Sequence, residues 1–152
     1  MTQKRIAASS LIQAAAQQIY AIIADYRDGH PRILPKPYFV SLTVEQGGVG
    51  AGTVVTFQMK VMGSLRTFHS VITEPEPGRV LVETDSKAGT VTTFTVDPRD
   101  NGRQAFVTIT TDLQVRDGFF GKVQGWMTAR LLRPIYVKEL EQLAAVATTQ
   151  AA

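Results

Sequence analysis

Residues 119–147 have the sequence FFGKVQGWMTARLLRPIYVKELEQLAAVA, in which apolar side chains recur at the spacing of an α-helix. The apolar stripe contains Leu131, Leu132, Ile135, Leu140 and Leu143, with Phe120, Val123, Trp126 and Met127 ahead of them. At ~1.5 Å per residue this helix is roughly 40 Å long, which is longer than any strand it could cover. The segment therefore predicts one long C-terminal helix, with a kink near Arg130 because Pro134 removes a backbone N–H donor.

The chain between residues 38 and 115 follows a period of two instead, which is typical of β-strands. Apolar residues alternate with polar ones over residues 38–44, 55–61, 65–73, 80–85, 91–97 and 104–115. Short turns rich in glycine and proline separate these segments, so they are predicted to form one antiparallel meander. Ahead of them, residues 4–12 predict a further strand, residues 14–26 an amphipathic helix, and residues 31–34 a short helical turn or lid.

The composition excludes several classes of protein. A chain of 152 residues fits one domain, which we place at residues 1–147, with residues 148–152 as a frayed tail. The absence of cysteine excludes a disulfide scaffold, Cys-ligated zinc, an iron–sulfur cluster and a cysteine nucleophile. Because the chain has only two histidines, we expect no metal site, and in the absence of a phosphate-binding loop we expect no cofactor. No segment has the ~18–20 consecutive apolar residues of a membrane span.

The net charge of +3 does not indicate a nucleic-acid-binding protein. Binding of adjacent phosphates needs clustered basic residues interleaved with aromatic ones, and here the basic residues are scattered. The densest group contains Lys122, Arg130, Arg133 and Lys138. We interpret this group as a solvated helix face, with an anionic partner as the alternative. No nucleic-acid partner is therefore expected, and the protein is expected to be a monomer or a weak homodimer.

The N-terminal stretch loosely resembles a secretion signal, since Lys4 and Arg5 precede a semi-apolar stretch that ends in three alanines. Ser9, Ser10 and Gln13 make the stretch too polar for the apolar core of such a signal. The apolar pattern also continues directly into the predicted helix. We therefore interpret these residues as part of the fold and expect a cytoplasmic protein.

Three short motifs, in this order and at this spacing, resemble a known superfamily. They are Ala24-Asp25-Tyr26 followed by His30-Pro31, Gly50-Ala51-Gly52-Thr53 at the start of a strand, and Glu76-Pro77-Gly78-Arg79 before another. With them, nearly the whole chain resembles the START-like, birch-pollen-allergen superfamily (SRPBCC, polyketide cyclase/dehydrase). The resemblance implies an α+β helix-grip fold: a curved antiparallel sheet of about seven strands around a long C-terminal helix, with two short helices after the first strand. It also implies an apolar cavity between sheet and helix, without fixing one chemistry.

Hairpin register predicts which side chains line that cavity, because paired residues share one face of a sheet. A two-residue loop at Gly63-Ser64 gives the pairs Val61–Arg66, Met59–Phe68, Phe57–Ser70 and Val55–Ile72. This face is apolar, so we assign it to the cavity. In the next hairpin, a three-residue loop at residues 87–89 gives the pairs Val82–Phe94 and Thr84–Thr92. Glu83 and Asp85 then point outward, so paired catalytic carboxylates are not expected.

The predicted ligand-binding residues are Phe57, Met59, Arg66, Phe68, Ser70, Val82, Phe94, Ile109, Trp126, Met127 and Arg130. Arg66 either binds a ligand carboxylate or reaches solvent, and Arg130 either enters the cavity or belongs to the basic helix face. His69 is expected at the surface, because the register turns it away from the cavity. His30 lies over the predicted cavity mouth. We interpret it as a structural or exposed residue, with a ligand contact as the alternative. No catalytic residue is assigned.

These observations favour a binding protein for a small hydrophobic ligand, lipid-like or aromatic and polyketide-like, held in the internal cavity. The alternative is a cyclase/dehydratase-type enzyme acting on a polyketide-like substrate in the same cavity. A third hypothesis is an interaction protein whose basic helix face carries the function. We favour binding over catalysis, because no ionisable group other than Arg66 or Arg130 is predicted to face the cavity.

Overall fold

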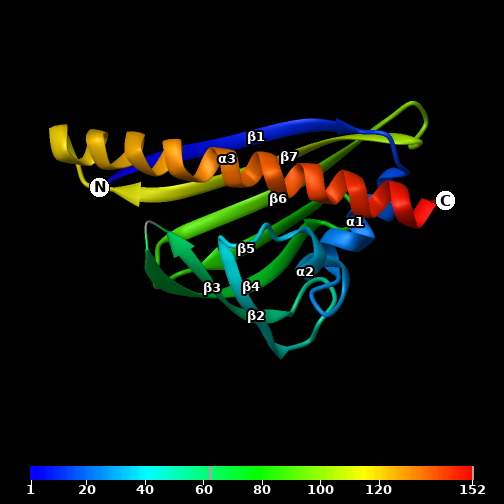
Figure 1. Ribbon diagram of the computed structural model, residues 1–152, viewed down its shortest axis with the longest axis horizontal. Helices are drawn as coiled ribbons and strands as arrows, with labels where there is room; N and C mark the ends of the chain where they lie inside the picture. The colour runs from blue at the N-terminus through cyan, green and yellow to red at the C-terminus, as the bar shows by residue number, and fades with distance from the viewer. Residues whose placement is uncertain (62, 152) are drawn as a thin grey trace.

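The computed structural model describes residues 1–61 and 63–151. In chain order the elements are β1 (Thr2–Ile12), α1 (Ala16–Ala24), α2 (Gly29–Ile33), β2 (Phe39–Gln46), β3 (Val54–Val61), β4 (Ser64–Glu76), β5 (Val80–Asp85), β6 (Thr90–Arg99), β7 (Gln104–Val115) and α3 (Gly118–Ala151). This order confirms the predicted α+β arrangement (Figure 1). Every predicted strand and helix is present, and α3 continues past its predicted end at residue 147.

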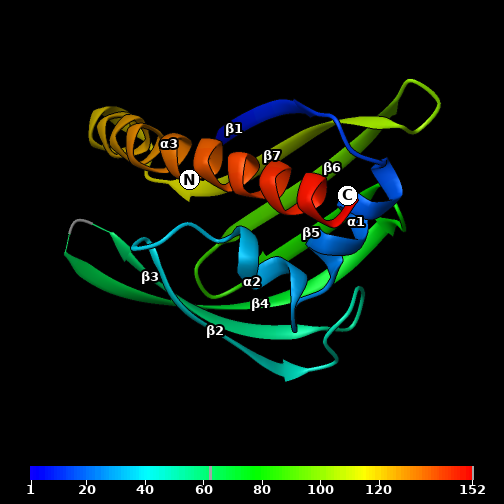
Figure 2. The same ribbon diagram turned by 45° about the vertical axis from the view of Figure 1, so that its right-hand side comes forward.

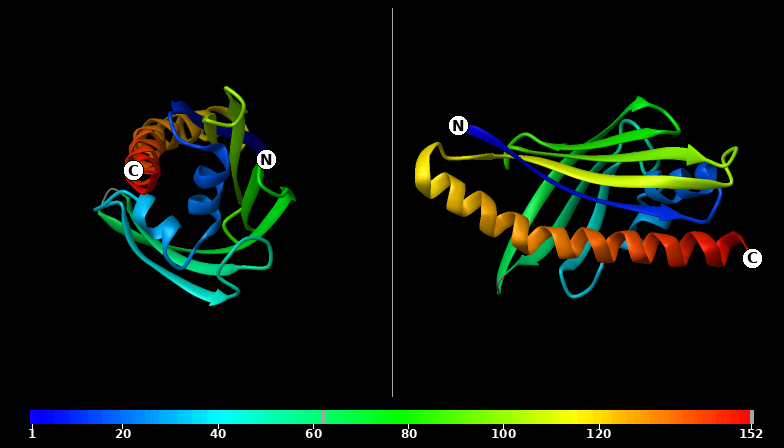
Figure 3. Two further views of the ribbon diagram at one scale, coloured as in Figure 1. Left: turned by 90° about the vertical axis from the view of Figure 1, so that its right-hand side faces the viewer. Right: turned by 90° about the horizontal axis from the view of Figure 1, so that it is seen from above.

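The strands form one seven-stranded antiparallel sheet in the order β1-β7-β6-β5-β4-β3-β2. Strands β2 to β7 follow one another as the predicted meander, and β1 pairs with β7 at the other edge. The sheet curves around α3, which runs along its open side (Figure 1 and Figure 2). Seen end-on, the sheet and α3 enclose α1 and α2 (Figure 3, left). This is the helix-grip arrangement that the resemblance implied.

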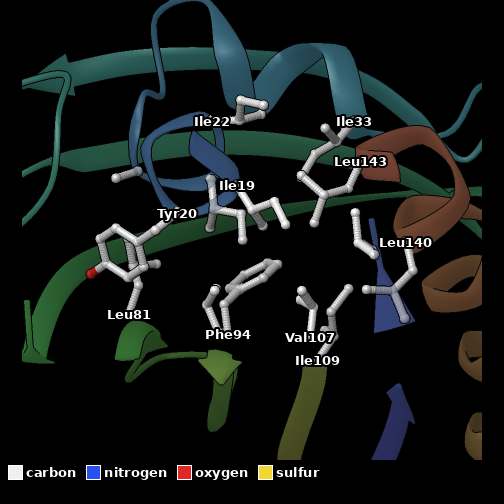
Figure 4. Close-up of a cluster of buried hydrophobic side chains, with 14 of the residues drawn as sticks. Ile19, Tyr20, Ile22, Ile33, Leu81, Phe94, Val107, Ile109, Leu140 and Leu143 are labelled. Atoms are coloured by element: carbon white, nitrogen blue, oxygen red, sulfur yellow. The ribbon is translucent and has the colours of Figure 1, made fainter. Parts of the chain in front are cut away.

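The apolar core fills only one end of this enclosure. Figure 4 shows α1, α2 and the C-terminal part of α3 packed against the sheet. The buried side chains there include Ile19 and Ile22 of α1, Ile33 of α2, Leu140 and Leu143 of α3, and Leu81, Phe94, Val107 and Ile109 of the sheet. At the other end, Phe119 and Phe120 at the start of α3 are 76% and 82% exposed. The space between sheet and helix is therefore packed at the α1 end and open toward the start of α3.

Gly29 lets α2 fold back onto α1. A Cβ atom at this position would lie 2.6 Å from the carbonyl oxygen of Ile22, so any other residue would push the two helices apart. The Asp25 carboxylate accepts a hydrogen bond from the N–H of Asp28 at 3.2 Å, which shapes the connection. The N–H of His30 then donates to the Asp25 carbonyl oxygen at 2.7 Å. This short turn holds the His30 ring at the inner end of the space between sheet and helix.

The β3–β4 hairpin confirms the predicted cavity face, although the predicted pairs are wrong. β4 begins at Ser64, and Met59 pairs with Arg66 rather than with Phe68. The register therefore differs by two residues from the predicted one. Because side chains alternate with a period of two, a shift of two keeps the same residues on the same face. His69 is exposed on the opposite face, as predicted.

The β5–β6 hairpin also differs from the predicted register, with a larger consequence. Glu83 pairs with Thr92, so the loop spans residues 86–89 instead of 87–89. The Asp85 carboxylate stabilises the longer loop by accepting a hydrogen bond from the N–H of Ala88 at 2.9 Å. A shift of one residue exchanges the two faces of a strand. Glu83 and Asp85 therefore lie on the concave face and Val82 on the convex face, so the predicted orientations of all three are wrong.

Helix α3 runs from Gly118 to Ala151 without interruption, with Pro134 inside it. Seen from above, its first turns are inclined to the rest of the helix (Figure 3, right). Pro134 has no N–H to donate to the carbonyl group one turn earlier, which is the physical reason for a bend in this region. None of the helices in residues 1–61 and 63–151 is both long and apolar enough to cross a membrane.

Candidate ligand-binding site

A cavity of about 750 Å³ lies between the first half of α3 and the concave face of the sheet. Side chains of α3 between Phe120 and Tyr136 form one wall, and side chains of β3, β4, β6 and β7 form the other. Five of the predicted binding residues line this outer cavity: Phe57, Met59, Arg66, Phe68 and Met127. A space of this size and composition suits a drug-sized or lipid-like molecule.

A smaller inner pocket of about 50 Å³ lies beside the outer cavity. The two spaces share Phe57, Met59, Thr92 and Tyr136 as lining residues, so they are adjacent. The inner pocket is also lined by His30, Leu34, Phe39, Leu42, Glu83, Phe94 and Glu139. It thus adds two carboxyl groups and an imidazole to the lining of the outer cavity, which is mainly apolar. Within the part of the chain that the structure describes, no group of three or more His, Asp or Glu side chains is placed to hold a metal ion.

The remaining predicted residues lie in four different places, and Val82 is on the convex face, away from both spaces. Phe94 lines the inner pocket, whereas Ser70 and Ile109 are buried without lining either space. Trp126 is 58% exposed, and the Arg130 guanidinium lies 5.3 Å from the centre of its ring. Both side chains therefore lie on the solvent side of α3, and of the two interpretations of Arg130 the structure supports the basic helix face.

Glu83 is held by aromatic neighbours at the inner pocket. The Tyr26 hydroxyl donates to Oε2 of Glu83 at 2.5 Å, and Nε2 of His30 lies 3.6 Å from the same oxygen. The Tyr26 and His30 rings are stacked with their centres 4.3 Å apart, and Phe94 meets His30 edge-on at 5.5 Å. The hydrogen bond from Tyr26 fixes Oε2 of Glu83, and no described residue donates a hydrogen bond to Oε1.

His30 is buried, and its partners determine its tautomer. Nδ1 lies 2.7 Å from the carbonyl oxygen of Ile23, which can only accept, so Nδ1 carries the proton. Burial lowers the pKa of His30, and the nearby Glu83 carboxyl group acts in the opposite direction. A neutral His30 therefore presents the lone pair of Nε2 toward Glu83 and adds no positive charge to the pocket at neutral pH.

Glu139 supplies the second carboxyl group of the inner pocket. It lies on α3 nearly one turn after Tyr136 and is 3% exposed. None of the described residues donates a hydrogen bond to its carboxyl group, which lines the inner pocket. Burial raises the pKa of Glu139 well above the usual range of a glutamate, and the proximity of Glu83 raises it further. Glu139 is therefore a neutral carboxylic acid at pH values where a surface glutamate is ionised.

Tyr136 lies where the outer cavity meets the inner pocket. Its hydroxyl oxygen is 2.5 Å from Oγ1 of Thr111, which in turn is 2.8 Å from Oγ1 of Thr92. Burial raises the pKa of Tyr136, so the phenol stays protonated. This chain of three hydroxyl groups fixes the Tyr136 ring at the entrance to the inner pocket.

Sequence analysis missed Glu83, Glu139 and Tyr136 as site residues. The one-residue error in the β5–β6 register accounts for Glu83. Glu139 has a signal in the sequence, because Ile135, Glu139 and Leu143 are spaced four residues apart and so share one helix face. An acidic residue inside an apolar stripe indicates a buried carboxyl group. Tyr136 has no signal that separates it from an ordinary core residue.

The fold and the cavity define this molecule as a helix-grip protein with a cavity between the sheet and the long helix. Residues 3–148 match the model of a family described as "Polyketide cyclase / dehydrase and lipid transport", and the chain belongs to that family. This confirms the resemblance inferred from the turn motifs. No curated protein matches the chain significantly.

Solved structures share the fold over nearly the whole chain. The KanY protein is 26% identical, with a TM-score of 0.82 over 97% of this chain and 99% of KanY. The Zhui aromatase/cyclase from Streptomyces sp. R1128 is 17% identical, with a TM-score of 0.78 over 99% of this chain and 97% of the enzyme. Norcoclaurine synthase from Thalictrum flavum is 16% identical, with a TM-score of 0.68 over 95% of this chain and 86% of the synthase. At these identities, the two enzymes show a common fold.

Proposed function

We propose that the protein binds a small, mainly apolar ligand in the outer cavity and places a polar group of that ligand in the inner pocket. The observation that carries this proposal is a mainly apolar cavity of about 750 Å³ beside a smaller pocket to which two carboxyl groups contribute. Burial of the ligand's apolar surface supplies affinity, at about 25 cal/mol per Å², and the few polar groups orient the ligand. The description of the family, which includes lipid transport, supports the same function.

A second candidate function is catalysis of the cyclase/dehydratase type on a polyketide-like substrate. The observation in its favour is the pair of carboxyl groups, Glu83 and Glu139, at the inner end of the cavity. A neutral Glu139 can donate a proton to a substrate carbonyl group, and Glu83 can accept one from a neighbouring group. Two carboxyl groups in different environments are suited to such a division of roles. The family description and the aromatase/cyclase structure support this candidate.

Nile red, a neutral dye that fluoresces in apolar surroundings, is expected to bind the protein with a saturable rise in fluorescence. Leu113→Trp is expected to raise the Kd of the dye about tenfold, because the larger side chain fills the outer cavity that Leu113 lines. A tenfold change in Kd corresponds to a loss of about 1.4 kcal/mol of binding free energy. Fluorescence titration of the two proteins measures the effect.

Thr110→Trp is the matched control for this titration. Thr110 lies on the same strand as Leu113 but on the convex face, away from the cavity. The Kd of Nile red for Thr110→Trp is expected to equal its Kd for the wild-type protein. A wild-type protein that does not bind the dye, or equal losses of affinity in the two variants, would overturn the proposed function.

A further inference from the structure

The inner pocket has a composition that the binding of an apolar ligand does not by itself explain. It contains two carboxyl groups, and none of the described residues that line it is a lysine or an arginine. Four aromatic rings surround the same space, those of Phe39, Phe57, Phe94 and Tyr136. We propose that this pocket binds the protonated amine of the ligand, which is therefore an aromatic or alkyl amine. The inference rests on the proposed function and names the class of its ligand.

Charge balance is the first argument. A buried carboxylate is costly unless an opposite charge or several hydrogen-bond donors accompany it. His30 does not supply that charge at neutral pH, because burial lowers its pKa. Arg66 is the one basic residue among the described residues that line the outer cavity, and it is exposed to solvent. A positive charge that balances the carboxyl pair when Glu139 gives up its proton would therefore come from the ligand.

The available hydrogen-bond acceptors match an ammonium group. Tyr26 and His30 both approach Oε2 of Glu83, which leaves Oε1 available. The Glu139 carboxyl group lines the pocket and receives no hydrogen bond from a described residue. An ammonium group has three N–H donors and no acceptor. The two carboxyl groups can accept at least two of its hydrogen bonds.

The size and the walls of the pocket fit the same group. A volume of about 50 Å³ admits one small polar group, since a water molecule takes up about 30 Å³ in the liquid. The faces of aromatic rings attract cations within about 6 Å. Phe57 and Met59 line both spaces, so an apolar chain attached to the nitrogen would extend from the inner pocket toward the outer cavity.

A neutral carbonyl group is the alternative occupant, because a protonated Glu139 can donate to its oxygen. The two occupants differ in proton balance. An ammonium group displaces the proton of Glu139, whereas a carbonyl group leaves that proton in place. The other titratable groups here are Glu83 of β5, His30 of α2 and Tyr136 of α3, with Tyr26 behind Glu83. Both tyrosines have raised pKa values and His30 is neutral, so a released proton comes from the carboxyl pair.

Displacement of Nile red by four small phenyl compounds tests the inference. Phenethylamine is expected to bind about tenfold more tightly than phenethyl alcohol, benzylacetone or hydrocinnamate, because hydrogen bonds between charged partners are the stronger ones. Glu139→Gln is expected to lower the affinity for phenethylamine about tenfold more than the affinity for phenethyl alcohol. Glu141→Gln, two residues further along α3 and exposed, is the matched control and should keep the preference for the amine.

Isothermal titration calorimetry in two buffers of different ionisation enthalpy measures the proton balance. Phenethylamine is expected to release about one proton per molecule bound to the wild type, and none from Glu139→Gln. Equal affinities for amine and alcohol, tighter binding of the ketone or the carboxylate, or amine binding without proton release would each overturn the inference. If the amine inference fails but Nile red still binds saturably, the proposed function stands. If the dye does not bind at all, both the proposed function and the amine inference are overturned.

Discussion

Phe94→Ala is expected to lower the free energy of unfolding by about 3–5 kcal/mol. Phe94 is 2% exposed and lies where the packed core meets the inner pocket (Figure 4). Its ring packs edge-on against His30, so truncation removes contacts with α2 as well as contacts within the sheet. The void left behind adds to the lost transfer free energy, because a closely packed core relaxes only in part. Urea denaturation followed by circular dichroism measures the change.

Phe119→Ala makes the same chemical change at a position where the structure predicts almost no effect. Phe119 is 76% exposed at the start of α3, beyond the end of the core. Its truncation is expected to change the unfolding free energy by no more than about 0.5 kcal/mol. Similar losses in the two variants would contradict the division of the enclosure into a packed end and an open end.

Glu139→Gln is expected to gain stability relative to the wild type as pH rises above about 4.5, the ordinary pKa of a glutamate. In the wild type, the folded state keeps a proton on Glu139 that the unfolded state releases. The free energy of unfolding of the wild type therefore falls with rising pH until the folded-state pKa is passed. The difference between variant and wild type should grow by up to about 1.4 kcal/mol per pH unit in this range. Urea denaturation at a series of pH values measures it.

His30 acts on stability in the opposite direction. Its lowered pKa means that the unfolded state binds a proton more readily, so stability is lost as pH falls below about 6.5. Both proteins contain His30, so the difference between them isolates the contribution of residue 139. The exposed Glu141→Gln variant should differ from the wild type by an amount that does not change with pH. If the difference in unfolding free energy between Glu139→Gln and the wild type also does not change with pH, the pKa of Glu139 is not raised.

The architecture could be predicted from the sequence because its signals are long. The helical period of residues 119–147 and the alternation over residues 38–115 each extend over many turns or strands, so single errors do not change the interpretation. The cavity face of β3 and β4 was also predictable. An error of two residues in that register does not change which side chains share a face.

The chemistry of the site could not be predicted in the same way, because it depends on single-residue register. The choice between a loop of three and of four residues after Asp85 decides whether Glu83 lies inside or outside. The sequence does not show that the Asp85 carboxylate caps the longer loop. Glu139 was also missed, although its position in the apolar stripe of α3 indicates a buried carboxyl group. The position of His30 depends on the close approach of Gly29 to Ile22, which is a tertiary contact.

The central claim is that an apolar ligand occupies the space between the sheet and the first half of α3. Methyl NMR of methionine-labelled protein tests it most directly, because Met59 and Met127 line the outer cavity from opposite walls and Met1 is an exposed reference. During a titration with Nile red, the Met59 and Met127 methyl signals are expected to shift in proportion to the dye bound, by the ring-current effect of the dye, while the Met1 signal stays in place. Saturable dye binding that leaves the Met59 and Met127 signals unmoved would contradict the claim.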